Sequence, residues 1–258
     1  VHIQHEYGIF GGLHGEYVLD FVRVLKKPFV ITFHTVLPDP DQELRKVTQE
    51  LTEKATFIHV MTEQAKHLLL VTYRLASEKV CVIPHGIPAM QFKPNIEAKS
   101  KLKLGRHTVL LTFGLLSRNK GIEYVIQSLP KIVKKYPDVL YVIAGATHPV
   151  VFHEEGEAYR NSLKALVKEL HLEKNVRFIN RFLNDEELLQ FLYAADMYVA
   201  TPLDPNQAVS GTLSYALGSG RPVVSTAFAQ AKELVTYDVG RLVEFRHPEV
   251  YTDAIMHL

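Results

Sequence analysis

The sequence predicts an α/β protein with two doubly wound, Rossmann-like domains of parallel strands, of which the first is incomplete. The first observation behind this prediction is that short apolar, β-branched runs alternate with longer segments of helical period. Apolar strands of this kind are typical of parallel sheets that helices cover on both faces. The second observation is that residues 85–106 break the alternation with prolines, lysines and polar residues, as a linker would. We therefore expect a first domain at residues 1–86, a linker at 87–104 and a second domain at 105–258.

The same patterns place the individual strands and helices in chain order. Strands are expected at residues 29–33, 57–61, 80–83, 109–113, 139–144, 176–179, 197–200 and 222–225. Helices are expected at residues 64–74, 123–134, 159–170 and 185–193. The helix at 123–134 has the clearest pattern, because its apolar residues recur every three or four positions and mark one buried face. The chain opens at Val1 inside a further strand and ends within a helix, so we expect sequence to be missing at both ends.

Composition and charge exclude several classes of protein. There are 29 Lys and Arg against 28 Asp and Glu, so the net charge is +1 and nucleic acid is not an expected partner. No apolar run approaches the roughly 18 residues of a membrane span, which leaves only peripheral membrane contact open. The 13 histidines form no His-Glu-x-x-His pattern and there is no cysteine pair, so no metal site is predicted. The single cysteine, Cys81, lies in an apolar run, and we expect a buried, reduced thiol in a cytoplasmic protein.

A first candidate site is the loop at residues 113–123, which follows a predicted strand. It contains Gly114 and reaches Lys120 where the next helix is expected to begin. A lysine at the positive end of a helix is unfavourable by roughly 0.3–1 kcal/mol. A bound anion would reverse this effect, because Lys120 and the free main-chain amides would then act together. The alternative is a solvated lysine, with the acidic Glu123 offsetting the helix dipole.

A second candidate site is the segment at residues 201–224, which reads as strand, loop, helix, glycine stop and strand. Ser210 and Thr212 are typical helix-capping residues, and Gly211 lets main-chain amides approach a ligand closely. Amides and hydroxyls at the start of a helix can hold a phosphate. The alternative is an ordinary capped helix that the following glycines end. Two such loops in one domain offer hydrogen-bond donors on both sides of a diphosphate.

Together the two loops resemble the sugar-donor site of the retaining glycosyltransferases of family four, the group 1 glycosyltransferases, which have the two-domain GT-B fold. The resemblance extends along nearly the whole chain. Residues 32–35 are similar to the family's strand-end histidine segment, and residues 60–63 with 82–88 to the stretch that leads into the second domain. Residues 114–121 are similar to its glycine–lysine loop, and residues 215–224 to a segment that ordinarily begins with a glutamate.

The chain departs from the family's pattern at three places. Leu115 stands where the family usually has an arginine, and Arg118 is the nearby residue that we expect to reach the same phosphates. Gln207 and Tyr215 occupy the places of two glutamates, the second of which commonly accepts hydrogen bonds from ribose hydroxyls. A phenol accepts one such bond but lacks the charge and the paired oxygens of a carboxylate. Both the identity of the sugar donor and ordinary turnover therefore stay open.

The resemblance implies transfer of a sugar from a nucleotide-diphosphate sugar to a glycan, lipid or small-molecule hydroxyl, with retained configuration and without a metal or cofactor. Lys120 would stabilise the departing phosphate by its charge, and the main-chain amides of residues 210–213 by their dipoles. Losing one such group would raise the barrier by roughly 3–4 kcal/mol. The donor-binding residues that we expect are Gly114, Arg118, Lys120, His148, Gln207, Ser210, Gly211, Thr212, Leu213 and Tyr215.

The first domain offers candidates at its own strand ends. His34 follows the strand at 29–33, and ligands of parallel sheets bind beyond the carboxyl ends of the strands. In the family that the chain resembles, a histidine here contacts the transferring sugar, which implies a catalytic role; otherwise His34 simply closes a strand. The loop with Gly11 and Gly12 follows the first strand and is expected on the acceptor side, unless it is a plain glycine turn.

Two further interpretations stay open. Gln207 and Tyr215 are compatible with a degenerate module that binds a nucleotide sugar without turning it over. The chain is also compatible with a sugar-nucleotide epimerase or a phosphorylase of the same fold, because a fold does not determine a function.

Overall fold

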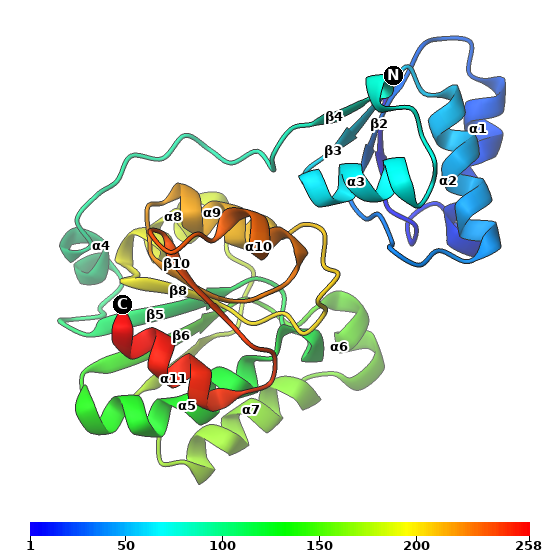
Figure 1. Cartoon of the computed structure of the whole chain (residues 1–258). Coiled ribbons are helices and arrows are strands. Elements are labelled where there is room, and N and C mark those ends of the chain that lie inside the picture. Colours follow the sequence, from blue (N-terminus) through cyan, green and yellow to red (C-terminus); the bar gives the residue numbers. More distant parts are fainter. The chain divides into compact units, whose positions relative to one another are not determined.

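The computed structural model describes residues 1–258 and divides into two compact α/β units (Figure 1). The first unit comprises Val1–Gly86 with Asn206–Ser210, and the second comprises Ile87–Pro205 with Gly211–Leu258. Each unit is built around its own parallel sheet. No helix has both the length and the apolar character needed to pass through a bilayer.

The first unit has a four-stranded sheet in the order β1-β2-β3-β4. Its strands are β1 (His2–His5), β2 (Val30–Phe33), β3 (Phe57–Val60) and β4 (Val80–Val82). Its helices are α1 (Val18–Val24), α2 (Gln42–Lys54) and α3 (Glu63–Val71), with short 3₁₀ turns η1 (Leu13–Gly15) and η2 (Ser77–Lys79). Because each strand pairs with the next one along the chain, right-handed crossovers place all three helices on the same face.

The two faces of this sheet therefore differ. One face carries Ile3, Ile31 and Ile58, which are at most 6% exposed and belong to a core that includes residues of all three helices. The opposite face carries polar side chains joined by hydrogen bonds across the strands, among them His2, Gln4, Thr32, His34 and His59. The expected helices on both faces are thus absent here, because the strand order never reverses within this unit.

The second unit has a six-stranded parallel sheet in the order β10-β9-β8-β5-β6-β7. Its strands are β5 (Thr108–Phe113), β6 (Val139–Ala144), β7 (Val176–Ile179), β8 (Met197–Ala200), β9 (Val223–Thr226) and β10 (Gly240–Val243). From β5 the chain first builds outward through β6 and β7, and then returns to the other side of β5 with β8. The unit is doubly wound, as predicted, and its topological switch point lies between β5 and β8.

Helices cover both faces of the second sheet (Figure 1). On one face α5 (Ile122–Lys135), α7 (Ala158–Glu169) and α11 (Pro248–His257) form a core with β-strand residues. On the other face lie α4 (Ile96–Lys101), α8 (Asp185–Ala194), α9 (Gly211–Gly218) and α10 (Ala229–Leu234). A 3₁₀ turn η3 (Arg118–Lys120) and the short helix α6 (Pro149–Glu155) lie in the loops that follow β5 and β6.

Local sequence signals explain where several helices begin. Asp41 caps α2 by accepting a hydrogen bond from the amide of Leu44 at 2.8 Å. Asn184 and Glu187 form a reciprocal capping box at the start of α8. In α5 the apolar positions expected from the sequence are buried, with Ile122 and Ile132 each 1% exposed. These helices therefore follow the patterns that predict them.

The segment at residues 87–104, expected to be a linker, contains α4 and packs within the second unit. Ala98 is 6% exposed, and Lys99 is buried with its Nζ 2.5 Å from Oδ2 of Asp196, which directly precedes β8. Asn95 donates to the same carboxylate. A six-residue helix with a buried lysine shows no apolar period, so the sequence pattern missed it.

The expectation of a buried thiol is wrong, because Cys81 is exposed. Cys81 pairs in register with His59 and shares the polar face of the first sheet, and β4 is the edge strand there. Its neighbours Val80 and Val82 alternate with it and point to the covered face. A three-residue edge strand reads as apolar throughout, although only one of its faces is covered.

Candidate functional site

The two loops predicted from the sequence meet at the switch point of the second sheet. β5 and β8 are hydrogen-bonded neighbours, so the loops that follow them start side by side. The amide of Leu203 donates to the carbonyl oxygen of Asn119 at 2.8 Å, and the hydroxyl of Thr201 donates to the carbonyl of Lys120. Gly121 has φ of +59°, and a Cβ there would lie 2.6 Å from the carbonyl oxygen of Thr201. Ligands of open parallel sheets bind at such a crevice.

Glycines bring the strand ends close around a pocket. Gly114 directly follows β5 with φ of +121°, and Gly145 directly follows β6 with φ of +149°. A Cβ on Gly145 would lie 2.0 Å from the carbonyl oxygen of Gly114, and a Cβ on Gly114 would lie 3.3 Å from Cγ2 of Thr212. The ends of β5 and β6 and the first turn of α9 therefore converge, and only glycine fits at these approaches.

The pocket at this convergence has a volume of about 200 Å³. Gly114, Leu115, Gly145 and Thr212 line one part of it. Phe182 and Leu183 from the segment between β7 and α8, and Asp185 and Leu188 from the start of α8, line another part. This segment was not predicted from the sequence, although the strand-end rule applied to β7 points to it.

Lys120 ends the turn η3, two residues before α5, and is not among the residues that line this pocket; it has no counter-ion. Its ammonium forms neither an ion pair nor a hydrogen bond, and burial lowers its pKa. Placing an unpaired cation in a partly buried position is costly. An anionic ligand that reached the ammonium would remove this cost, so the site has an electrostatic preference for anions.

Arg118 is engaged away from this pocket. Its Nη2 lies 2.7 Å from Oε2 of Glu155 on α6, and its guanidinium lies over the ring of Tyr159 at 5.5 Å. The ion pair with Glu155 also raises the pKa of Arg118. The expected phosphate contact of Arg118 therefore stays a prediction that requires this pair to open.

The first turn of α9 holds the residues expected to bind phosphate. Ser210 precedes Gly211, at which the helix begins, and is 7% exposed. The side chain of Thr212 is hydrogen-bonded to the buried phenol of Tyr198 on β8, and Leu213 is fully buried. The helix start is thus anchored on the sheet beside Gly114.

The remaining expected donor residues lie on the same loops or beside them. Gln207 folds the loop before α9 by donating from Nε2 to the carbonyl oxygen of Val209 at 3.1 Å. Tyr215 is half-buried on α9 and packs against the core. His148 caps α6, because its Nδ1 accepts from the amide of Val150 at 3.3 Å. That capping bond leaves the Nε2 of His148 as the ring nitrogen available to a ligand.

In the first unit, His34 follows β2 and Nε2 of its ring lies 2.7 Å from Oε1 of Gln4. Burial lowers the pKa of His34, and the carboxylate of Glu6 opposes that effect. Glu6 accepts from the hydroxyl of Thr35 at 2.8 Å and from the amide of Tyr7 at 3.0 Å. Glu6, which directly follows β1 and acts on His34, was not predicted from the sequence.

The glycine loop after β1 lies at the same sheet edge. Gly11 and Gly12 have φ of +73° and +70°, and a Cβ on either would lie 2.9 Å from a ring carbon of Tyr17. The aromatic ring covers the loop backbone, so these positions require glycine. Their expected place on the acceptor side stays a prediction.

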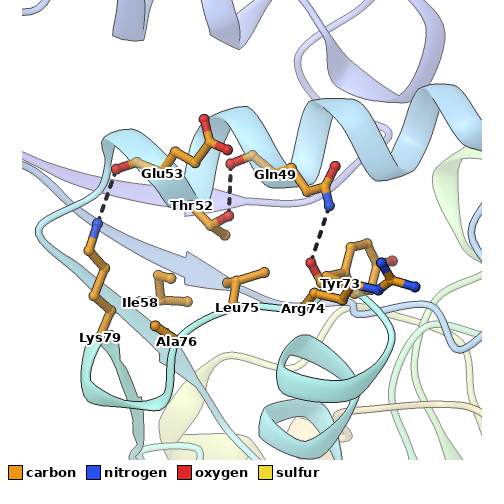
Figure 2. Close-up of a pocket in the computed structure, with 9 residues that line it drawn as sticks. All are labelled: Gln49, Thr52, Glu53, Ile58, Tyr73, Arg74, Leu75, Ala76 and Lys79. Carbon is orange, nitrogen blue, oxygen red and sulfur yellow. Dashed lines mark hydrogen bonds between the residues drawn. The ribbon is translucent and has the colours of Figure 1, made fainter.

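A second pocket, of about 210 Å³, lies in the first unit at the amino ends of the strands (Figure 2). It is lined by the second half of α2, by Ile58 of β3 and by residues between α3 and β4. Figure 2 shows Lys79 donating to the carbonyl oxygen of Glu53 and Gln49 donating to that of Tyr73, at 3.0 and 3.2 Å. Its polar groups are largely satisfied by the protein itself, and the amino ends of parallel strands are not where their ligands bind. We therefore place the candidate site at the switch point.

The sequence profile of the glycosyl transferases group 1 matches residues 93–258, well over half of the chain and all of both loops. The chain belongs to this family. Within the group 1 glycosyltransferases it is 27% identical over 230 residues to the D-inositol 3-phosphate glycosyltransferase of Corynebacterium kroppenstedtii, covering 85% of this chain and 49% of that protein. It is 27% identical over 186 residues to the mannosylfructose-phosphate synthase of Agrobacterium fabrum, covering 70% of this chain and 39% of that protein. The chain thus spans about half the length of such relatives.

Solved structures of other proteins share the fold. Anabaena HepE in complex with UDP superimposes with a TM-score of 0.78 at 20% identity, over 94% of this chain and 65% of that one. The sucrose-phosphate synthase of Thermosynechococcus elongatus gives a TM-score of 0.76 at 21% identity, over 99% and 63%. These similarities confirm the predicted α/β fold class of GT-B type.

Proposed function

We propose that this chain carries the sugar-donor site of a retaining, metal-independent hexosyltransferase that moves a sugar from a UDP-sugar to an acceptor hydroxyl. The observation that carries this proposal is the unpaired, partly buried ammonium of Lys120, on the loop after β5 that meets the loop after β8 at the switch point. UDP is proposed as the nucleotide because HepE, whose fold this chain shares, has been crystallised with UDP and with UDP-glucose.

The chemistry follows from charge. The bond between the anomeric carbon and the diphosphate oxygen breaks, and negative charge grows on the departing phosphate. Lys120 offers a full positive charge, and the amides at the start of α9 offer fixed dipoles. Groups arranged before the reaction stabilise such charge without reorganising, which is how electrostatic catalysis lowers a barrier.

The first test is the binding of UDP to Lys120→Met, which keeps the side-chain length but removes the charge. A hydrogen bond to a charged group contributes about 1.5–3 kcal/mol, so UDP affinity should fall roughly 10- to 150-fold. Lys131→Met is the matched control, because Lys131 is an exposed lysine of α5, the helix that follows Lys120. Calorimetry and thermal shift with UDP, GDP and ADP would measure both affinity and base preference. Unchanged UDP binding by Lys120→Met would contradict the proposal.

A second candidate function is a module that binds UDP without turnover. It is favoured by Tyr215, which stands in place of a glutamate in α9. Transfer of labelled sugar by the protein in its longest form distinguishes the two. Turnover that Lys120→Met abolishes supports the enzyme, whereas tight UDP binding without turnover supports the module.

A further inference from the structure

Two adjacent buried side chains at the start of α7 reach two different loops of the candidate site. Tyr159 is 2% exposed and Arg160 is 1% exposed. They extend to the loops that follow β5 and β6. Neither residue lines the pocket itself, and neither shows any sequence signal of function.

Tyr159 holds the first turn of α5, immediately after Lys120. Its phenol accepts a hydrogen bond from the amide of Ile122 at 3.2 Å and donates one to Oε2 of Glu123 at 2.6 Å. The guanidinium of Arg118 lies over the same ring. Tyr159 therefore contacts residues on both sides of Lys120 in the sequence: Arg118 before it, and Ile122 and Glu123 after it. The Lys120 ammonium itself has no partner.

Arg160 holds the loop after β6. Its Nη2 donates to the carbonyl oxygen of Gly145 at 2.9 Å and to the hydroxyl of Thr147 at 3.3 Å. Its Nε donates to Glu157 at 2.8 Å, and Thr147 donates to the same carboxylate oxygen at 2.7 Å. Burial would raise the pKa of Glu157, but these hydrogen bonds outweigh it and the pKa is lowered. Gly145 in turn abuts Gly114, so the network supports one wall of the pocket.

A buried ion pair is a weak device for stability, because desolvation offsets most of its attraction and well-packed apolar residues often serve as well. One guanidinium nitrogen, Nη1 of Arg160, is buried without any hydrogen-bond partner. What the network does achieve is a defined geometry. It ties the Lys120 loop and the Gly145 loop to consecutive residues of a single helix.

We infer that Tyr159 and Arg160 are positioning residues of the sugar-donor site: Tyr159 fixes the loop that carries Lys120, and Arg160 fixes the loop of Gly145, which packs on Gly114. This inference rests on the proposed function. Small displacements of a charged group from its ligand reduce binding and rate strongly. Loss of the Tyr159 hydroxyl should therefore act on UDP through Lys120, although the hydroxyl does not contact the ligand.

The decisive experiment is a double-mutant cycle with UDP as the probe. Tyr159→Phe should weaken UDP binding about tenfold in the otherwise unchanged chain, and by less than twofold in a chain that already carries Lys120→Met. Tyr251→Phe is the matched control, because Tyr251 is fully buried in the same core and its hydroxyl has no hydrogen-bond partner. It should leave UDP affinity unchanged. Equal losses in both backgrounds, or no loss from Tyr159→Phe, would overturn the inference.

Arg160 is tested by graded replacement. Arg160→Lys keeps a charged donor for the Gly145 carbonyl and should retain most of the UDP affinity, whereas Arg160→Met should lose roughly tenfold or more. In the turnover assay the loss should appear mainly in KM for the UDP-sugar. If Arg160→Met fails to fold, Thr147→Val removes one member of the same network without removing the charge. If Arg160→Met binds UDP as tightly as the parent chain does, the role of Arg160 is refuted. If Arg160→Met does not fold, the same result for Thr147→Val would refute it.

The cycle also separates the inference from the proposed function. If Lys120→Met binds UDP as the parent chain does, the proposed function fails. If Lys120→Met loses affinity while Tyr159→Phe is additive with it, only the positioning role fails.

Discussion

Lowering the pH from 7 to 4 should destabilise the first unit through a single buried side chain, His5. Its ring is fully buried between Tyr7, Phe10 and Phe33, with ring centroids 4.9, 5.7 and 4.9 Å away. Neither ring nitrogen has a hydrogen-bond partner. Burial, and to a smaller degree the nearby His34, lower the pKa of His5 from 6.5 to about 4.

The sign and size of the effect follow from this pKa. Below pH 6.5 the unfolded chain binds a proton at His5, but the folded chain does not until the pH approaches 4. Stability is therefore fully present above pH 6.5 and is lost as the pH falls to about 4. Linkage with these two values gives a loss of about 2 kcal/mol at pH 5 and about 3 kcal/mol at pH 4.

The assay is urea unfolding of the parent chain and of His5→Phe at pH 7, 5 and 4, followed by circular dichroism. Phenylalanine suits the aromatic surroundings, cannot titrate and gives up no hydrogen bond, so stability at pH 7 should be equal or slightly higher. The difference between the two proteins should grow by about 3 kcal/mol towards pH 4. His153→Phe, at an exposed position of α6, controls for the loss of a histidine as such. Parallel pH profiles for His5→Phe and the parent chain would refute the reasoning.

Three other outcomes follow from single contacts. Gly145→Ala should abolish UDP binding and lower the melting temperature, because its Cβ would lie 2.0 Å from the carbonyl oxygen of Gly114; calorimetry that finds normal binding would contradict this. Asp196→Asn should lower the free energy of unfolding, measured with urea, by about 2–3 kcal/mol, because it removes the counter-charge of the buried Lys99. A change of less than about 0.5 kcal/mol would contradict this. Lys120→Met should raise the melting temperature of the ligand-free chain, because an apolar side chain replaces an unpaired, partly buried cation. Adding UDP should no longer raise that temperature further. A lower melting temperature of the ligand-free variant would contradict this.

The strands of the second unit were the most predictable part of the fold. The runs expected at residues 109–113, 139–144 and 176–179 coincide with β5, β6 and β7 within one residue. β5 and β6 are covered on both faces, so their apolar character is nearly continuous, whereas the edge strand β7 is partly exposed and contains Arg177. The same rule misled at the first sheet, where polar and apolar side chains alternate and Cys81 turned outward.

The two loops of the candidate site were also predictable, because glycines and capping residues act locally. Their contact through Leu203 and Asn119 agrees with the strand-end rule. The direction of Arg118 was not predictable. Its partner Glu155 is 37 residues away, and which charges meet depends on how α6 folds back over the loop.

By itself the sequence determined the fold class, most strand positions and the loops where a diphosphate is proposed to bind, because backbone preference and apolar period are local properties of the chain. Only the tertiary structure decided the strand order that makes β5 and β8 neighbours, the burial of Lys99 and the reach of Tyr159 and Arg160 into separate loops. Each of these depends on contacts between residues far apart in the chain, and such contacts leave no periodic trace in the sequence.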